Sequence, residues 1–127
     1  MMKRILPKAN NIILFSLACL YLGSCYKAAE NFIQQEISSP GNNYKAIVFS
    51  REAGATTGFN TQVSIVEENK ELPNKPGNVF IADKIDNVKL FWESEKELHI
   101  ILPDKDIRIY RKKELLGNIK IVYQYIK

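Results

Sequence analysis

His99 is the single histidine of the 127-residue chain, so it is the side chain best suited to act as a general base near neutral pH. It alternates with Leu98 and Ile100, and a strand would therefore place it on the face opposite these two residues. No cysteine or serine motif accompanies it as a nucleophile. We interpret His99 as an outward strand residue rather than a general base, and we predict no catalytic residues.

Asp104 and Asp106 have the spacing of the first two ligands of a calcium-binding loop. The further ligands and the glycine that such a loop needs do not follow. Because Pro103 precedes the pair, an ordinary tight turn explains it better. The basic run at residues 111–113 is similarly typical of a solvated turn, with contact to anionic lipid headgroups as the alternative. We expect no metal and no cofactor.

The loop from Gly54 to Phe59 combines two glycines, Gly54 and Gly58, with two hydroxyl-bearing residues, Thr56 and Thr57. Glycine allows positive φ, and hydroxyl groups both donate and accept hydrogen bonds. The loop lacks the Gly-Lys-Ser/Thr ending of a phosphate-binding loop. Binding residues concentrate on loops over rigid β scaffolds, so Thr56, Thr57 and Phe59 form our candidate binding loop. The alternative is a structural Ω-like turn that Phe59 caps by packing into the core.

Residues 1–24 have the three parts of a secretory signal peptide in their usual order. A basic start is followed by an apolar stretch, residues 12–22, and small residues then precede Cys25. The apolar stretch is too short for an ordinary membrane-spanning helix, which needs roughly 20 apolar residues. We predict cleavage between Ser24 and Cys25. The basic residues of the start are Lys3, Arg4 and Lys8.

Leu22-Gly23-Ser24-Cys25 resembles the lipobox of bacterial lipoproteins, in which a leucine and two small residues precede a cysteine. The resemblance implies diacylglycerol on the Cys25 sulfur, cleavage before Cys25, and a further acyl chain such as palmitate on the new amino group. Several acyl chains anchor a protein stably, whereas one binds only marginally. The alternatives are an uncleaved anchor, an ordinary signal followed by a chance cysteine, and lipidation at Cys19, where Ser16 replaces the leucine.

The lipoprotein resemblance implies that the mature chain lies in the cell envelope and is bound to the membrane through its lipid. In that class an aspartate directly after the lipidated cysteine favours retention in the inner membrane, and here the residue is Tyr26. We therefore expect the outer membrane, facing the periplasm, if the organism has two membranes. With Cys19 removed and Cys25 capped, the mature chain keeps no thiol to mispair in an oxidising compartment.

The net charge of +4 arises mostly in the signal peptide. Three of the 18 basic residues lie in residues 1–24, which contain no acidic residue, so the mature chain carries 15 basic and 14 acidic residues. This balance gives no reason to expect a polyanionic partner, and we predict no binding to nucleic acid.

From residue 38 onward, turn-forming residues separate short β-rich runs. Several runs alternate with a period of two, which is typical of a sheet with one buried face; Val88, Leu90 and Trp92 share such a face, and we expect Trp92 in the core. Short connections favour antiparallel neighbours. The sequence predicts an all-β fold, a single small antiparallel meander of six to seven strands in a sandwich or curled sheet. The expected strands are residues 44–51, 61–67, 78–83, 87–93, 97–102, 106–112 and 118–126.

These patterns divide the chain into three parts. Residues 1–24 are the cleaved signal peptide, and residues 25–37 form a lipidated tether whose apolar spacing allows a short helix. Residues 38–127 form the β domain, which is long enough to build one hydrophobic core.

Parts of this domain are similar to a group of small uncharacterised bacterial proteins. The similar segments are Gly54-Ala55-Thr56-Thr57-Gly58-Phe59, Leu72-Pro73-Asn74 and Gly77-Asn78-Val79-Phe80-Ile81-Ala82-Asp83. The resemblance covers most of residues 38–125, and it implies neither an activity nor any functional residue.

The lipid anchor and the compact β domain together favour a non-enzymatic binding or accessory module of the cell envelope. Its partner would be another envelope protein or an exported toxin, as for an immunity lipoprotein. The alternative is an envelope hydrolase or an enzyme inhibitor that uses the loop from Gly54 to Phe59. A deep pocket joining His99 to Thr56 or Thr57 would favour the alternative, and a flat apolar surface would favour the binding module.

Overall fold

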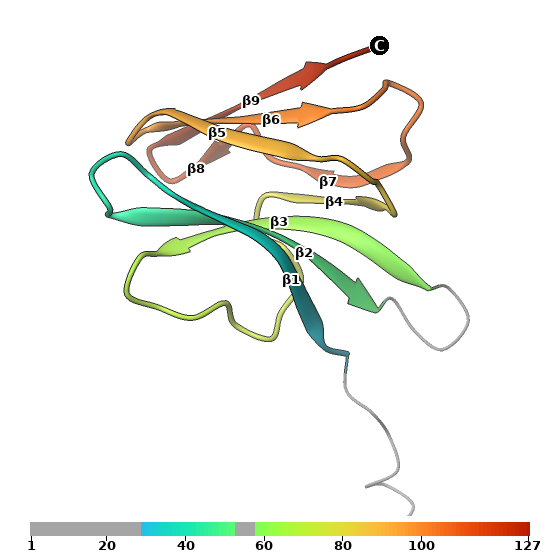
Figure 1. Ribbon diagram of the computed structural model, residues 1–127, viewed down its shortest axis with the longest axis horizontal. Coiled ribbons are helices and arrows are strands. Elements are labelled where there is room, and N and C mark those ends of the chain that lie inside the picture. The colour runs from blue at the N-terminus through green and yellow to red at the C-terminus, as the bar shows by residue number, and fades with distance from the viewer. Residues whose placement is uncertain (1–28, 53–57) are drawn as a thin grey trace, which may run out of the picture.

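The computed structural model describes residues 29–52 and 58–127. Within these ranges the protein forms nine β-strands and no helix. Figure 1 shows how the strands are arranged. The predicted all-β class is therefore confirmed. No helix in the described ranges is long and apolar enough to cross a membrane. The predicted signal peptide, its cleavage site after Ser24 and the lipidation site at Cys25 lie outside the described residues.

The strands form two sheets that face each other (Figure 1). The first sheet has the order β1-β2-β3-β4-β7, and all of its neighbours are antiparallel. Its strands are β1 (Asn31–Ser38), β2 (Tyr44–Glu52), β3 (Phe59–Glu67), β4 (Phe80–Asp83) and β7 (Ile109–Lys112). The second sheet has the order β5-β6-β9-β8. Its strands are β5 (Lys89–Ser94), β6 (Glu97–Leu102), β9 (Ile119–Tyr125) and β8 (Leu115–Leu116).

The hydrophobic core lies between the two sheets, because alternate residues of each strand turn their side chains inward. The inward faces predicted from period-two alternation are confirmed, and Trp92 packs against the core although it is only half-buried. The fully buried side chains of the second sheet belong to Leu98, Ile100 and Leu102. Those of the first sheet include Ala46, Val63 and Phe80.

The first sheet is covered on its outer face as well. Ile47 and Phe49 of β2 are fully buried there, beside Ser64 and Gln62 of β3, with which they pair in register. Residues 68–79, the connection from β3 to β4, run under this face (Figure 1), and we call them the covering loop. This explains why residues 46–49 of β2 are apolar on both faces of the strand.

Two strands were missed by the sequence interpretation. Residues 31–38, expected to belong to a tether with room for a short helix, form strand β1. The polar and apolar residues of β1 do not alternate regularly, so the sequence contains no strand pattern here. The segment forms a strand because its backbone pairs with β2. Strand β8 has only two residues, too few to leave a pattern.

The connections also differ from a simple meander. The chain passes from one sheet to the other between β4 and β5, between β6 and β7, and between β7 and β8. As a result β6 and β9 are parallel neighbours, whereas the expected pairing was antiparallel. The other strand pairs of the described ranges are antiparallel, as predicted.

Candidate functional site

The predicted binding loop joins β2 to β3, and the structure describes only its last two residues. Gly54, Thr56 and Thr57 lie outside the described residues. Gly58 has a φ of 72°, in the left-handed region that favours glycine, as its position in the loop indicated. Phe59 is 46% exposed, so the alternative in which Phe59 caps the loop by packing into the core is wrong.

Phe59 instead contacts a second exposed aromatic residue. Its ring packs edge-on against that of Phe32 in β1, which is 48% exposed, with 5.8 Å between the ring centroids. Ile33, the next residue of β1, is 53% exposed. We call Phe32, Ile33 and Phe59 the Phe32 end of the domain. Phe32 and Phe59 lie on one face of the first sheet, whereas Ile33 pairs with Phe49 and points to the opposite face, because neighbouring residues of a strand alternate. Side chains of this size are costly to leave in water.

An open pocket of about 520 Å³ lies beside the Phe32 end. At its base, the hydroxyl of Thr61 accepts a hydrogen bond from Ile85 N at 2.8 Å and donates one to Ile85 O at 3.3 Å. This hydroxyl is therefore fully used by the fold rather than free to attack a substrate. The residues that line the pocket are Phe32, Gln34, Ser50, Phe59, Thr61, Lys84, Ile85, Asp86 and Asn87, and His99 is not one of them.

His99 lies on the outer face of the second sheet, opposite Leu98 and Ile100, as the alternation predicted. Its ring stacks on Phe91 of β5, with 4.5 Å between the ring centroids and 27° between the planes. Its Nε2 lies 2.7 Å from Glu97 Oε2, and its Nδ1 lies 2.8 Å from Gln124 Nε2. A neutral imidazole with its proton on Nε2 satisfies both contacts, so the lone pair that a general base would use is already bound.

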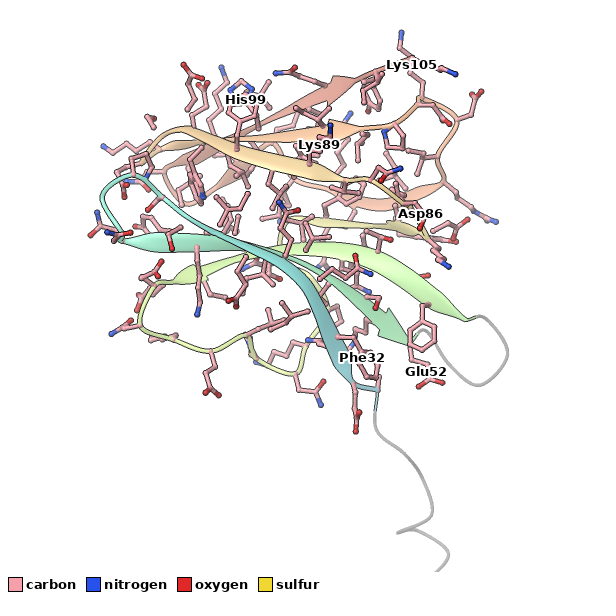
Figure 2. All side chains as sticks on the ribbon, viewed as in Figure 1. Phe32, Glu52, Asp86, Lys89, His99 and Lys105 are labelled. Atoms are coloured by element: carbon pink, nitrogen blue, oxygen red, sulfur yellow. The ribbon has the colours of Figure 1, made fainter. Side chains whose placement is uncertain are left out.

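Phe91, His99, Ile101 and Val122 form one continuous surface, which we call the Phe91 face. The strand registers place His99 beside both Phe91 and Val122, and Ile101 follows His99 two residues later on the same side. Phe91 is 37% exposed, Ile101 and Val122 are half-buried, and the His99 side chain is 13% exposed beneath its neighbours. In Figure 2 His99 and Lys89 lie on the side of the domain away from the first sheet. The described strands form two sheets, and the first sheet lies on the opposite side of the second sheet from this face (Figure 1).

The outer face of the first sheet has the opposite character, because the covering loop is fastened to it. Gly77 N donates to the buried Gln62 Oε1 at 2.7 Å, and Asn78 N donates to Ser64 Oγ at 3.0 Å. The side-chain amide of Asn78 also bonds both backbone groups of Ile65, at 2.9 and 2.8 Å, in the manner of a neighbouring strand. The protein therefore covers one outer face with its own chain and leaves the Phe91 face open.

The acidic and basic motifs have structural roles. Asp104 Oδ1 accepts a hydrogen bond from Asp106 N at 2.6 Å, which is the tight turn that the sequence indicated. No three metal-binding side chains come together among the described residues. The basic run of residues 111–113 is exposed and lies at the end of β7, where Arg111 and Lys112 belong to the strand expected over residues 106–112. Arg111 donates to Gly77 O at 2.6 Å, and Lys112 donates to the Tyr125 hydroxyl at 3.0 Å.

A carboxylate cluster was not foreseen from the sequence. Glu95, in the turn between β5 and β6, accepts hydrogen bonds from Ser39 Oγ and Asn43 Nδ2, each at 2.9 Å, and from Gly41 N. The Asn43 side chain and then the Gly41 backbone hold the pKa of Glu95 below its ordinary value. The only signal in the sequence was the turn-rich composition of residues 38–43, which does not reveal a partner more than 50 residues away.

Comparison with models of protein families, with curated proteins and with solved structures finds no match to this chain. The Phe32 end and the Phe91 face are the two surfaces of the described residues at which an exposed aromatic ring packs against a second ring.

Proposed function

We propose that the protein is a membrane-anchored, non-enzymatic binding module of the cell envelope, which recognises a partner protein through the Phe91 face. Cys25 carries the lipid anchor, and the outer membrane facing the periplasm is the location if the organism has two membranes. The partner is another envelope protein or an exported toxin. The single observation that carries the proposal is the open Phe91 face, which contrasts with the covered outer face of the first sheet.

The composition of the Phe91 face suits protein recognition. An aromatic ring stacked on an imidazole, beside two aliphatic side chains, offers an apolar centre. Exposed charged side chains of Lys89, Glu93 and Lys120 lie around it. An apolar centre with a polar rim is the usual anatomy of a protein interface, where aromatic residues are enriched.

The rigidity of this face also supports the proposal. Phe91, His99 and Gln124 come from three hydrogen-bonded neighbouring strands, so their side chains are held in place before a partner arrives. A preorganised surface loses little conformational entropy on binding. Truncating the aromatic ring should therefore weaken binding without unfolding the sheet.

The test is capture of the partner from intact cells. A tagged full-length protein with a photo-crosslinking amino acid in place of Phe91 should capture one stoichiometric protein partner. The same amino acid in place of Tyr110, an exposed aromatic residue on the outer side of the first sheet, should not capture it. Phe91→Ala should abolish recovery of the partner by the tag, and Tyr110→Ala should preserve it. Equal capture from both positions would refute the Phe91 face as the recognition surface.

The loop from Gly54 to Phe59 offers the alternative, an envelope hydrolase or an enzyme inhibitor, and the open pocket beside Phe59 is the observation in its favour. Replacing Thr56 and Thr57 together by alanine separates the two proposals. The double variant should keep the partner if the Phe91 face binds it. If the double variant lost the partner while Phe91→Ala still bound it fully, the loop from Gly54 to Phe59 would be favoured as the binding site.

A further inference from the structure

We infer that the Phe32 end rests on the lipid bilayer, with Phe32, Ile33 and Phe59 at the boundary between headgroups and acyl chains. This inference rests on the lipid anchor at Cys25, which belongs to the proposed function. It adds a second interaction surface, whose partner is the membrane itself, and it fixes how the domain is oriented.

The first step is the length of chain between the anchor and the domain. Asn31, the first residue of β1, follows Cys25 by six residues. A fully extended chain spans at most about 3.6 Å per residue, so β1 begins within about 22 Å of the lipidated residue. This upper limit holds for any conformation of the intervening residues. The end of the domain that carries Phe32 therefore stays close to the bilayer surface.

The second step is the chemistry of this end. Phe32, Ile33 and Phe59 are each about half exposed, and the two aromatic rings contact each other. Apolar and aromatic side chains at the membrane-facing end of a peripheral protein insert into the region between headgroups and acyl chains, here Phe32 and Phe59 from one face of the sheet and Ile33 from the other. Burial there removes from water the surface that the domain itself leaves uncovered. Because the anchor already holds the domain at the membrane, insertion needs no further loss of translational freedom.

The third step is charge. Glu30, Glu52 and Asp86 are exposed around this end, and they are opposed by Arg51 and Lys84. A surface that carries charges of both signs has no strong electrostatic attraction to anionic headgroups. The contact is therefore apolar, and it should form on zwitterionic phosphatidylcholine and be insensitive to salt.

The fourth step is orientation. Figure 2 places Phe32 and Glu52 at one side of the domain and His99 and Lys89 at the other. With the Phe32 end on the bilayer, the Phe91 face points away from it. The membrane and a protein partner can then be bound at the same time.

The test uses lipidated full-length protein, purified from cells and reconstituted into phosphatidylcholine vesicles with brominated acyl chains, which quench tryptophan. Trp92 is the single tryptophan, so Trp92→Phe provides a background for one new reporter. In this background Phe59→Trp should emit at shorter wavelength and lose emission in brominated relative to ordinary vesicles. Phe91→Trp, the matched control on the opposite side, should show neither change. Equal quenching at both positions, or none at position 59, would overturn the inference.

Vesicle flotation and lipid crosslinking distinguish failure of the membrane contact from failure of the lipid anchor. Flotation with vesicles separates the two proposals, because protein that floats but shows no quenching at position 59 retains the anchor and refutes only the membrane contact. Protein that does not float overturns the anchor and the inference together.

With the unmodified sequence, a photoactivatable phosphatidylcholine should crosslink to the tryptic peptides 28–45 and 52–70, which hold the Phe32 end, and not to peptide 90–96. The reverse pattern would refute the inference without any substitution.

Discussion

Glu95 accepts a hydrogen bond from the Ser39 hydroxyl at 2.9 Å, although the two residues lie 56 positions apart in the chain. The same carboxylate bonds Gly41 N and Asn43 Nδ2. It thereby fastens the turn between β5 and β6, in the second sheet, to the turn between β1 and β2, in the first. An ionised carboxylate suits this position because every neighbour donates a hydrogen bond to it.

The first prediction concerns the pH dependence of this contact. Folding lowers the pKa of Glu95 from its ordinary value of 4.5, so ionised Glu95 stabilises the protein above that value. This stabilisation is lost as the pH falls through the lowered pKa. Glu95→Gln should be less stable than the wild type at neutral pH, and the difference should shrink below about pH 4.5. Urea unfolding between neutral and acidic pH measures the difference in stability between the wild type and Glu95→Gln, and Glu93→Gln is the charge-matched control. A difference that stays constant with pH would contradict the assignment.

The second prediction concerns Trp92, whose Nε1 donates to Ile37 O at 3.0 Å while its rings pack on the core. Trp92→Phe keeps an aromatic ring and removes the hydrogen bond, which should cost about 1 kcal/mol of stability. Trp92→Ala also removes the packing and should cost about 3 kcal/mol. Chemical denaturation of both variants gives the two contributions. A loss below about 1 kcal/mol for Trp92→Ala would place the residue at the surface.

The third prediction concerns Gln62, a buried residue of β3 whose side-chain oxygen accepts from Gly77 N at 2.7 Å. Gln62→Leu preserves the size of the side chain but leaves the amide of Gly77 without its acceptor. An unsatisfied buried donor costs about 1–3 kcal/mol, so the variant should be destabilised by that amount. Gln34→Leu, at an exposed position of β1, should change stability by no more than about 0.5 kcal/mol. Equal stability of the two variants would rule out this role for Gln62.

The fourth prediction compares two glycines. A Cβ at Gly77 would lie 2.8 Å from Val63 O and 2.9 Å from Phe80 O, both backbone atoms that cannot move aside. Gly58 has a φ of 72° but open space around it. Gly77→Ala should therefore cost about 3 kcal/mol through overpacking, and Gly58→Ala only about 1 kcal/mol through backbone strain. Thermal and chemical unfolding rank the two. The opposite order would show that the covering loop can shift away from the sheet.

Much of the fold could be predicted because local alternation reports which face of a strand is buried. All seven expected strands are present, and the run of Leu98, Ile100 and Leu102 lies in the core as its pattern indicated. The outward position of His99 followed from the same alternation. Strand β1 was not predicted because pairing with β2, rather than its own sequence pattern, makes it a strand. Phe32 and Ile33 are both apolar and both exposed, so the residues of β1 do not alternate between apolar and polar.

Long-range relationships could not be predicted in this way. No local pattern indicates that Glu95 meets Ser39, that the covering loop lies on Gln62, or that β6 and β9 are neighbours. The ring of Phe59, a residue of the candidate binding loop, contacts Phe32, which lay in a segment interpreted as a tether. Sequence spacing reports the face on which a residue lies, whereas the identity of the opposing residue depends on the whole topology.

The position of β9 has a consequence for how the protein folds. This strand contains residues 119–125 and follows β8 along the chain, yet it lies between β6 and β8 in its sheet. The hairpins from β1 to β3 can assemble from neighbouring segments, but β6 keeps an unpaired edge until β9 arrives. Contacts between distant segments slow folding, because a long loop must close before they form. Docking of the hairpin of β8 and β9 onto β6 is therefore expected to follow the hairpins from β1 to β3, as is the pairing of β4 with β7, whose partners lie still further apart in the chain. A chain truncated before residue 119 should fail to reach the native state.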